Sequence, residues 1–599
     1  MKKQTFIVGV LILTIGGFIA KVIGALYKIP LTNALGSTGM GLYYLVFPLY
    51  SLLLVFSSSG VSIAVSKLVS EARANKLKKN ETMYFKAGIT LSFVSSLLFS
   101  ILLVIFSGTI ASLQGNVLAT KGYIAIAPAL VSASLIAVVK GYFQGVENMF
   151  PSSVAMIFEQ VFKLIVGLFL AYRFLKYGVE YAVMGSILAV SISELITLFV
   201  MLINYAWHKA KNDYKFYTKD PASLKLKEIL PKSKIVKVGR YKVGKLVRFK
   251  KRPIWVLTAK NGKLKYVKIK VLYFHNSNEN ITFFTAIKQT LHILVPTTLS
   301  SFVLPAITLV DSFLVINILV SSGVSSYTAT SLYGLSNGVV SALISLPVIL
   351  TSAMASSMMP NLSGIYSVGR VQETTDRSAF YIKITFVLVL PIFVYFISFA
   401  PDIISALYNL SDNGVISEFS YTYKLLIVAS VGIIYNAFLS TFVSIMQVIG
   451  KPFKVFYVML LAFALRMGLM ILLLNISSVN IFGVVISNVV FYLLCDIVCV
   501  VEIKKTLDLQ FNFLKSFVCP IIASVVSAGC VFVTKHLTKN INIWLNLAIG
   551  GVVCIVVYFV LIWTLKCFSL SEKKYLPFNR VLKNKNKIWC IVLFFSGNN

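Results

Sequence analysis

The sequence predicts an all-α polytopic membrane protein with about 14 transmembrane helices. Of its 599 residues, 58% are hydrophobic and 13% are charged, and the mean hydropathy is +0.85. Soluble domains carry about 25% charged residues, so this composition excludes an ordinary soluble protein. Apolar runs of about 17–25 residues, the length needed to cross a bilayer, recur along the whole chain. Positive charge also falls on every second connection between these runs, which is typical of cytoplasmic loops.

The expected spans follow directly from the apolar runs. They lie near residues 6–29, 41–66, 84–112, 121–143, 153–175, 181–206, 286–320, 328–358, 379–400, 421–449, 453–475, 480–501, 514–535 and 543–566. Lys and Arg gather before the first span and after every even-numbered one, and the loop after the ninth span is acidic. The positive-inside rule therefore predicts that both termini are cytoplasmic. Lys535 and Lys539, between the last two spans, are the exception.

A faint internal repeat divides the spans into two groups. Gln144, Pro151 and Lys163 recur, in the same order, as Gln447, Pro452 and Arg466. Two related six-helix lobes are typical of transporters that bind substrate between two halves. The expected domains are an N-terminal lobe (1–207), a basic cytoplasmic insertion (208–284), a C-terminal lobe (285–502), two extra helices (503–567) and a basic cytoplasmic tail (568–599).

The insertion 208–284 is the most basic part of the chain, with 21 Lys and Arg against 4 Asp and Glu. Charged and apolar residues alternate there, and Asn261-Gly262 between two β-prone runs is a strong hairpin signal. The pattern predicts a small β-rich module rather than a basic linker. Anionic lipid headgroups are its expected partner, and nucleic acid is the less favoured one.

Two lysines in the first span are the leading candidates for substrate binding. Gly17, Lys21, Gly24 and Lys28 are spaced so that they share one stripe of a helix. A Lys in the bilayer centre costs about 2.5–3.5 kcal/mol, so these side chains need partners or water. We expect a cationic stripe that faces a cavity; the alternative is that both lysines, and Lys28 in particular, reach the membrane surface.

Other charged residues inside the predicted spans are also candidates, because burying a charge in lipid is costly. They are Glu159, Lys163, Glu194, Asp311, Arg466 and Asp496. Glu159 and Lys163 are four residues apart, so they could instead neutralise each other on one helix. Asp311 could meet a Lys of the first span or act as a coupling carboxylate. Arg466 could bind substrate or have a packing role, and Asp496 is expected to be a solvated residue at the end of its span.

No pattern typical of an enzyme or a metal site occurs. The four histidines are scattered, and the seven cysteines lie late in the chain without the spacing of a metal set. The glycines of the segment 36–41 are not preceded by a strand, so they indicate a turn rather than a nucleotide loop. We expect no enzymatic activity, no cofactor and no metal, and the coupling ion is left unassigned.

Several motifs resemble a known family. They are Gly36-Ser-Thr-Gly-Met-Gly-Leu-Tyr43, Lys140-Gly-Tyr-Phe-Gln-Gly145 with Asn148, Met149 and Pro151, Glu159-Gln160 with Lys163, Leu332-Tyr-Gly-Leu-Ser-Asn-Gly338, Pro347, and Ser357-Met-Met-Pro360. In order and spacing they resemble the stage V sporulation protein B group. That group is close to the MurJ-like lipid II flippases of the MOP (MATE-like) exporter superfamily.

The resemblance implies two six-helix lobes around a central cavity and export by alternating access. It also implies essential cavity arginines in the first helix, and Lys21 stands at one such position. The eighth span has no basic residue, whereas many MurJ-like proteins have an Arg there. The basic insertion has no counterpart in the family pattern.

Together these observations predict a flippase of undecaprenyl-diphosphate-linked saccharide, a peptidoglycan precursor or related oligosaccharide, in the plasma membrane of a bacterium. Lys21, Lys28 and Arg466 are the expected diphosphate ligands, and Asp311, Glu159, Lys163 and Glu194 the cavity or coupling charges. A cation-coupled drug exporter of the MATE type is the first alternative. A non-transporting membrane scaffold that recruits a partner through the insertion is the second.

Overall fold

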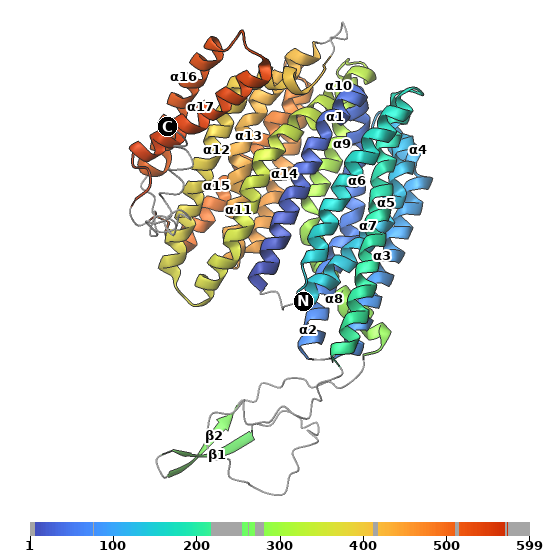
Figure 1. Ribbon diagram of the computed structural model, residues 1–599, viewed down its shortest axis with the longest axis vertical. Coiled ribbons are helices and arrows are strands. Elements are labelled where there is room, and N and C mark those ends of the chain that lie inside the picture. The colour runs from blue at the N-terminus through green and yellow to red at the C-terminus, as the bar shows by residue number, and fades with distance from the viewer. Residues whose placement is uncertain are drawn as a thin grey trace, which may run out of the picture.

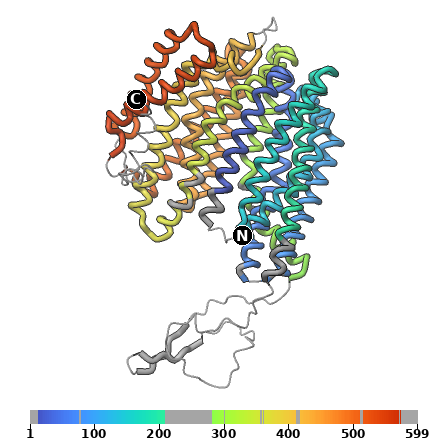
Figure 2. The backbone as a smooth tube through the Cα atoms, viewed as in Figure 1, coloured from blue at the N-terminus to red at the C-terminus, as the bar shows by residue number. Residues whose placement is uncertain are grey.

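The computed structural model describes residues 6–75, 77–216, 254–260, 263–269, 281–410, 417–509, 514–569 and 572 (Figures 1 and 2). Helices dominate these residues, as the apolar runs predict. The first half contains α1 (Phe6–Leu54), η1 (Val55–Ser59), α2 (Gly60–Ala74), α3 (Lys78–Ile105), α4 (Ser107–Leu113), η2 (Val117–Ala119), α5 (Thr120–Gly145), α6 (Phe150–Leu175) and α7 (Val179–Phe216). The second half contains α8 (Phe283–Ser301), α9 (Val303–Ser321), α10 (Ser326–Gly334), η5 (Leu335–Val340), α11 (Ser341–Ser367), α12 (Val371–Leu407), α13 (Glu418–Val448), α14 (Pro452–Leu474), α15 (Phe482–Leu507), η6 (Leu514–Val518), α16 (Cys519–Leu537) and α17 (Ile543–Thr564).

Twelve helical stretches in the described residues are long and apolar enough to cross a membrane, so the expected count of 14 is not supported. Two differences account for the change. The expected spans 6–29 and 41–66 belong to one continuous helical stretch, Ile12–Arg73. The expected span 286–320 is interrupted between α8 and α9, which leaves two shorter apolar helices.

Gly36 explains why the first two expected spans are continuous. Its φ of 70° and ψ of −179° are not helical, so α1 changes direction there without an intervening loop. A residue with a side chain is disfavoured at this positive φ, whereas glycine adopts it readily. The glycines that predicted a turn therefore make a kink within one helix.

The insertion contains one hairpin in its described part. Strands β1 (Ile254–Lys260) and β2 (Lys263–Ile269) pair antiparallel, with Ile254 opposite Ile269 and Lys260 opposite Lys263. This agrees with the hairpin predicted at Asn261-Gly262. A β-rich module is not supported, because the other residues between 217 and 280 lie outside the described ranges.

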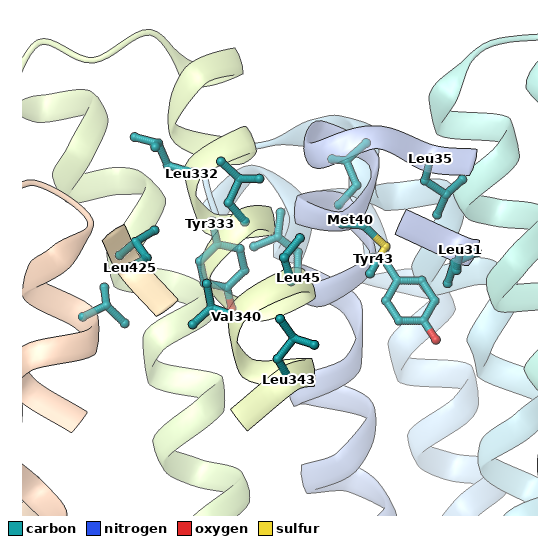
Figure 3. Close-up of a cluster of buried hydrophobic side chains, with 14 of the residues drawn as sticks. Leu31, Leu35, Met40, Tyr43, Leu45, Leu332, Tyr333, Val340, Leu343 and Leu425 are labelled. Atoms are coloured by element: carbon teal, nitrogen blue, oxygen red, sulfur yellow. The ribbon is translucent and has the colours of Figure 1, made fainter. Parts of the chain in front are cut away.

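The two halves share one hydrophobic core at the end of the molecule that contains Gly36. There, residues of α1 pack with residues of α10, η5, α11 and α13 (Figure 3). At the opposite end, where α7 ends and α8 begins, the cores are separate. One contains residues of α2, α3, α5, α6 and α7 together with Ala286 of α8, and the other contains residues of α11 to α15. We call these the joined end and the insertion end.

Candidate functional site

Helices α1 and α6 pack closely because small residues line their contact. A Cβ atom added at Gly16 would lie 2.7 Å from the Cβ of Ser153, and one at Gly24 would lie 2.7 Å from Oε1 of Gln160. The Ser153 hydroxyl donates a hydrogen bond of 2.9 Å to the Ile12 carbonyl. Gly24 of the predicted stripe and the neighbouring Gly16 therefore let α1 approach α6, and Lys28 lies close enough to interact electrostatically with Lys163.

Three lysines lie along this pair of helices, and we call Lys21, Lys28 and Lys163 the lysine seam. Lys21 is exposed, whereas Lys28 and Lys163 are partly buried. The ammonium group of Lys28 lies 5.3 Å from the ring centroid of Tyr44, and that of Lys163 lies 5.1 Å from the ring of Phe47. Aromatic faces attract cations but do not neutralise their charge. Among the described residues, none of the three has a carboxylate partner within 4.0 Å.

The acidic residues near the lysine seam have other partners than the spacing of Glu159 and Lys163 in the sequence suggests. Glu159 lies 3.6 Å from the ammonium of Lys140 on α5, and it accepts a hydrogen bond from Gln160. Glu194, on α7, is 7% exposed and interacts electrostatically with Glu159, Lys140 and Lys163. The structure therefore has an ion pair between Glu159 and Lys140 in place of one between Glu159 and Lys163.

Lys140 is the residue that sequence reasoning missed. It was counted as a loop charge at the end of its span, although it belongs to one of the recognised motifs and α5 continues to Gly145. With Lys140 included, Lys28, Lys140 and Lys163 form a charged cluster with Glu159 and Glu194, and Lys21 lies about two turns before Lys28 on α1. The excess of positive charge makes the cluster suited to bind an anionic group, above all a phosphate.

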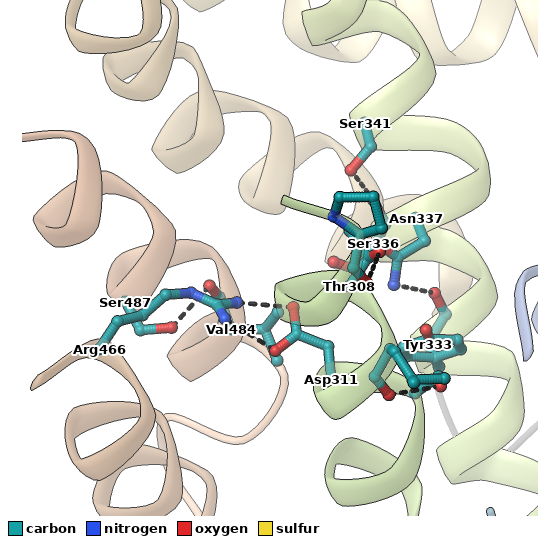
Figure 4. Close-up of polar contacts among 12 residues, drawn as sticks. Thr308, Asp311, Tyr333, Ser336, Asn337, Ser341, Arg466, Val484 and Ser487 are labelled. Atoms are coloured by element: carbon teal, nitrogen blue, oxygen red, sulfur yellow. Dashed lines mark hydrogen bonds and ion pairs between the residues drawn. The ribbon is translucent and has the colours of Figure 1, made fainter. Parts of the chain in front are cut away.

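Arg466 and Asp311, two further candidates that the sequence predicts separately, bind each other (Figure 4). The guanidinium donates to both carboxylate oxygens, at 2.8 and 2.7 Å, and Arg466 is fully buried. Asp311 lies on α9 and Arg466 on α14. In this arrangement neither side chain is free to contact a substrate or a Lys of α1.

Asp496 corrects a sequence expectation. It is 5% exposed rather than solvated, and both of its carboxylate oxygens lack a hydrogen-bond partner among the described residues. The sequence predicts that Asp496 contacts solvent at the end of the span, because Glu502 and two lysines follow within nine residues. The helix continues to Leu507, so Asp496 lies more than two turns inside it.

The joined end is closed by polar contacts between the two halves. The hydroxyls of Ser37 on α1 and Ser331 on α10 both donate to Oε1 of Glu418, at the start of α13, and Ser331 also donates to Ser37 at 2.9 Å. Glycines allow this approach, because a Cβ at Gly334 would overlap the Ser37 carbonyl oxygen. Glu418 is 4% exposed, so these hydrogen bonds lie in a low-dielectric region.

The chain matches a family model described as "Polysaccharide biosynthesis protein" over residues 6–225. It is 22% identical to the stage V sporulation protein B of Bacillus subtilis over 585 residues, which cover 96% of this chain and 98% of that protein. It is also 28% identical to the lipid II flippase MurJ of Bacillus subtilis over 215 residues, covering 34% of this chain and 39% of that one.

Solved structures agree with these relatives. A lipid II flippase MurJ in an inward closed conformation matches with a TM-score of 0.62 at 17% identity, covering 93% of this chain and 99% of that one. An inward-facing multidrug resistance transporter of the MATE family matches with a TM-score of 0.57 at 14% identity, covering 82% and 94%.

MurJ is named a lipid II flippase, and the MATE protein is named a multidrug resistance transporter. The chain is a multi-pass membrane protein with the fold of the MOP superfamily, and the predicted resemblance to stage V sporulation protein B and the MurJ-like flippases is confirmed.

Proposed function

We propose that the protein is a flippase that moves a polyprenyl-diphosphate-linked saccharide, a peptidoglycan precursor or a related oligosaccharide, across the bacterial cell membrane. The observation that carries this proposal is the lysine seam, three ammonium groups with no carboxylate partner among the described residues. A diphosphate must lose water to cross the membrane, and charged hydrogen bonds to lysines replace that water.

The arrangement of the cores supports alternating access. The joined end is closed by a shared core and by the Ser37, Ser331 and Glu418 contacts, whereas at the insertion end the core of α11 to α15 is separate from the core that α8 shares with the first half. With the basic insertion on the cytoplasmic side, as its charge predicts, the substrate would enter from the cytoplasm. The saccharide would lie between the halves while the polyprenyl tail stays in lipid.

Two other functions are weaker. A cation-coupled drug exporter of the MATE type would carry cationic substrates, which the lysine seam would repel. A non-transporting scaffold would have no use for three amines along α1 and α6 that have no carboxylate within 4.0 Å among the described residues. The fold alone fits the exporter equally well, because both transporter types match it.

Flipping of a fluorescent polyprenyl-diphosphate saccharide in proteoliposomes tests the proposal. Hydrogen bonds to charged groups contribute about 1.5–3 kcal/mol each, so Lys21→Gln should slow flipping about 10–100-fold. Lys21→Arg should retain part of the activity, because it keeps the charge. Lys176→Gln is a matched control, since Lys176 lies beyond the end of α6 against Tyr177. Wild-type flipping by Lys21→Gln would exclude the seam as the diphosphate site.

A further inference from the structure

Asp496 lies inside α15, and no positively charged side chain in the described part of the chain pairs with it. Its oxygens have no hydrogen-bond partner among the described residues, and the residue is 5% exposed. Cys495 and Cys499, one position before it and three after it, are also buried and belong to two hydrophobic clusters. An ionised carboxylate in such surroundings is strongly disfavoured.

The groups on α14 that could neutralise Asp496 are used elsewhere. Lys454 pairs with Glu502, and Ala462 belongs to the same hydrophobic cluster as Cys495, the neighbour of Asp496, so the turn of α14 between residues 458 and 463 packs near this part of α15. That turn contains only apolar residues. The cations on either side, Lys454 and Arg466, are bound to Glu502 and Asp311.

In the described parts of α13 and α12, too, no cation pairs with Asp496. Leu439 packs with Cys495 and Phe442 with Cys499, and α13 has no titratable residue between residues 436 and 448. On α12, Lys383 lies at this level because its neighbour Ile382 packs with Cys499. The ammonium of Lys383 is held at 2.6 Å by the Cys567 carbonyl and at 2.8 Å by Glu572.

The remaining titratable groups of the described residues do not pair with Asp496 either. On α15 itself they are Tyr492, one turn before Asp496, the two cysteines, Glu502, which pairs with Lys451, Lys454 and Lys505, and Lys504 and Lys505, which are exposed in the last turn of the helix. The residues of α9 in the cluster that contains Cys495 are Val303 and Ile307, both apolar. Among the described residues, the cations Lys383, Lys454 and Arg466 are therefore bound to other acceptors, and no cation is paired with Asp496.

We infer that Asp496 is a proton-binding site. Its carboxyl holds a proton while α13, α14 and α15 are packed as here, and it releases that proton to water when a rearrangement of the second half admits solvent. The link between this release and transport rests on the proposed function. The proton-binding site itself does not.

A hydrophobic carbodiimide tests the site directly on the purified full-length protein. The reagent takes the acid proton on a nitrogen while the carboxyl oxygen adds to its central carbon, and the adduct rearranges to a stable N-acylurea. Mass spectrometry should locate this adduct on Asp496 at neutral pH, and Asp496→Asn should lack it. Glu502→Gln, which removes an ion-paired carboxylate of the same helix, should leave labelling unchanged.

Infrared difference spectroscopy is the second measurement, because a small reagent could fail to enter the cluster. Wild type minus Asp496→Asn should contain the C=O band of a protonated carboxyl at neutral pH. Absence of both the band and the adduct would overturn the proposal.

The release of the proton is tested in proteoliposomes with an imposed pH gradient. The gradient should change the flipping rate of the wild type at least several-fold and leave Asp496→Asn, which mimics the protonated form, unchanged. An equal response in both proteins would show that the proton is never released. If the wild type flips no polyprenyl-diphosphate saccharide, the proposed function fails. The infrared C=O band and the carbodiimide adduct would still show whether Asp496 binds a proton.

Discussion

Arg466 donates two hydrogen bonds, of 2.8 and 2.7 Å, to the two carboxylate oxygens of Asp311 across the contact between α14 and α9 (Figure 4). The two residues are 155 positions apart, and Arg466 is fully buried. Bidentate geometry of this kind fixes the two helices in orientation as well as in distance. The pair therefore holds the second half of the molecule together, and both charges compensate each other.

Removing either partner of this pair should destabilise the protein. Arg466→Gln leaves the Asp311 carboxylate buried and uncompensated, a change that typically costs about 3–5 kcal/mol. The double variant Asp311→Asn with Arg466→Gln should recover part of the loss, because no charge then remains. Thermal unfolding in detergent should give the lowest melting temperature for the single variant, a higher one for the double variant and the highest for the wild type. A single variant as stable as the wild type would refute the structural role.

The joined end should depend on the close approach of α1 and α10. Gly334→Val places a side chain against the Ser37 carbonyl oxygen, so the helices must separate and the hydrogen bonds to Glu418 must weaken. A cysteine introduced at Ser331 should then react faster with a water-soluble maleimide. Gly364→Val is the control, because no atom lies within 4 Å of a Cβ there. Equal reactivity in both backgrounds would mean that this contact does not close the end.

The loop charges predict the orientation of the chain in the membrane. Lys and Arg gather on the connections that include 208–284, so this insertion should face the cytoplasm. In intact cells, a membrane-impermeant maleimide should miss a cysteine at Ser233 and reach one at Ser411. The opposite labelling pattern would reverse the topology and the proposed direction of transport.

The basic insertion should not be needed for the transport step itself. Its charges should attract anionic lipid, at about 1 kcal/mol for each Lys or Arg near the surface, and salt should weaken this attraction. Deleting residues 217–280 leaves the lysine seam on α1 and α6 unchanged, so flipping should continue. Complete loss of flipping by a correctly folded deletion variant would place the insertion in the transport machinery.

Local patterns in the sequence predict a helix or a hairpin well where a single sequence feature is enough to determine it. Apolar length predicts most helices, and the Asn-Gly pair predicts the hairpin between Lys260 and Lys263. Gly36 was interpreted as part of a turn because φ cannot be read from a residue type, and both a loop and a kinked helix use glycine there. The expected span near 286–320 contains an interruption between α8 and α9 that its apolar composition conceals.

The partners of charged side chains could not be predicted in the same way, because they depend on packing between distant helices. Glu159 and Lys163 have ideal spacing for a pair, yet Glu159 is paired with Lys140, on another helix. Asp311 and Arg466 were each identified as unusual, but nothing in either span indicates that they meet. Burial of Asp496 likewise depends on three neighbouring helices.

The central claim is that the lysine seam binds the diphosphate of a polyprenyl-linked saccharide. Mass spectrometry of lipids that copurify with the protein tests it most directly, in the wild type and in the triple variant Lys21→Gln, Lys28→Gln and Lys163→Gln. The expected result is a polyprenyl-diphosphate saccharide with the wild type and its loss from a triple variant that still folds. Absence of this lipid from the wild type, or its retention by the triple variant, would contradict the claim.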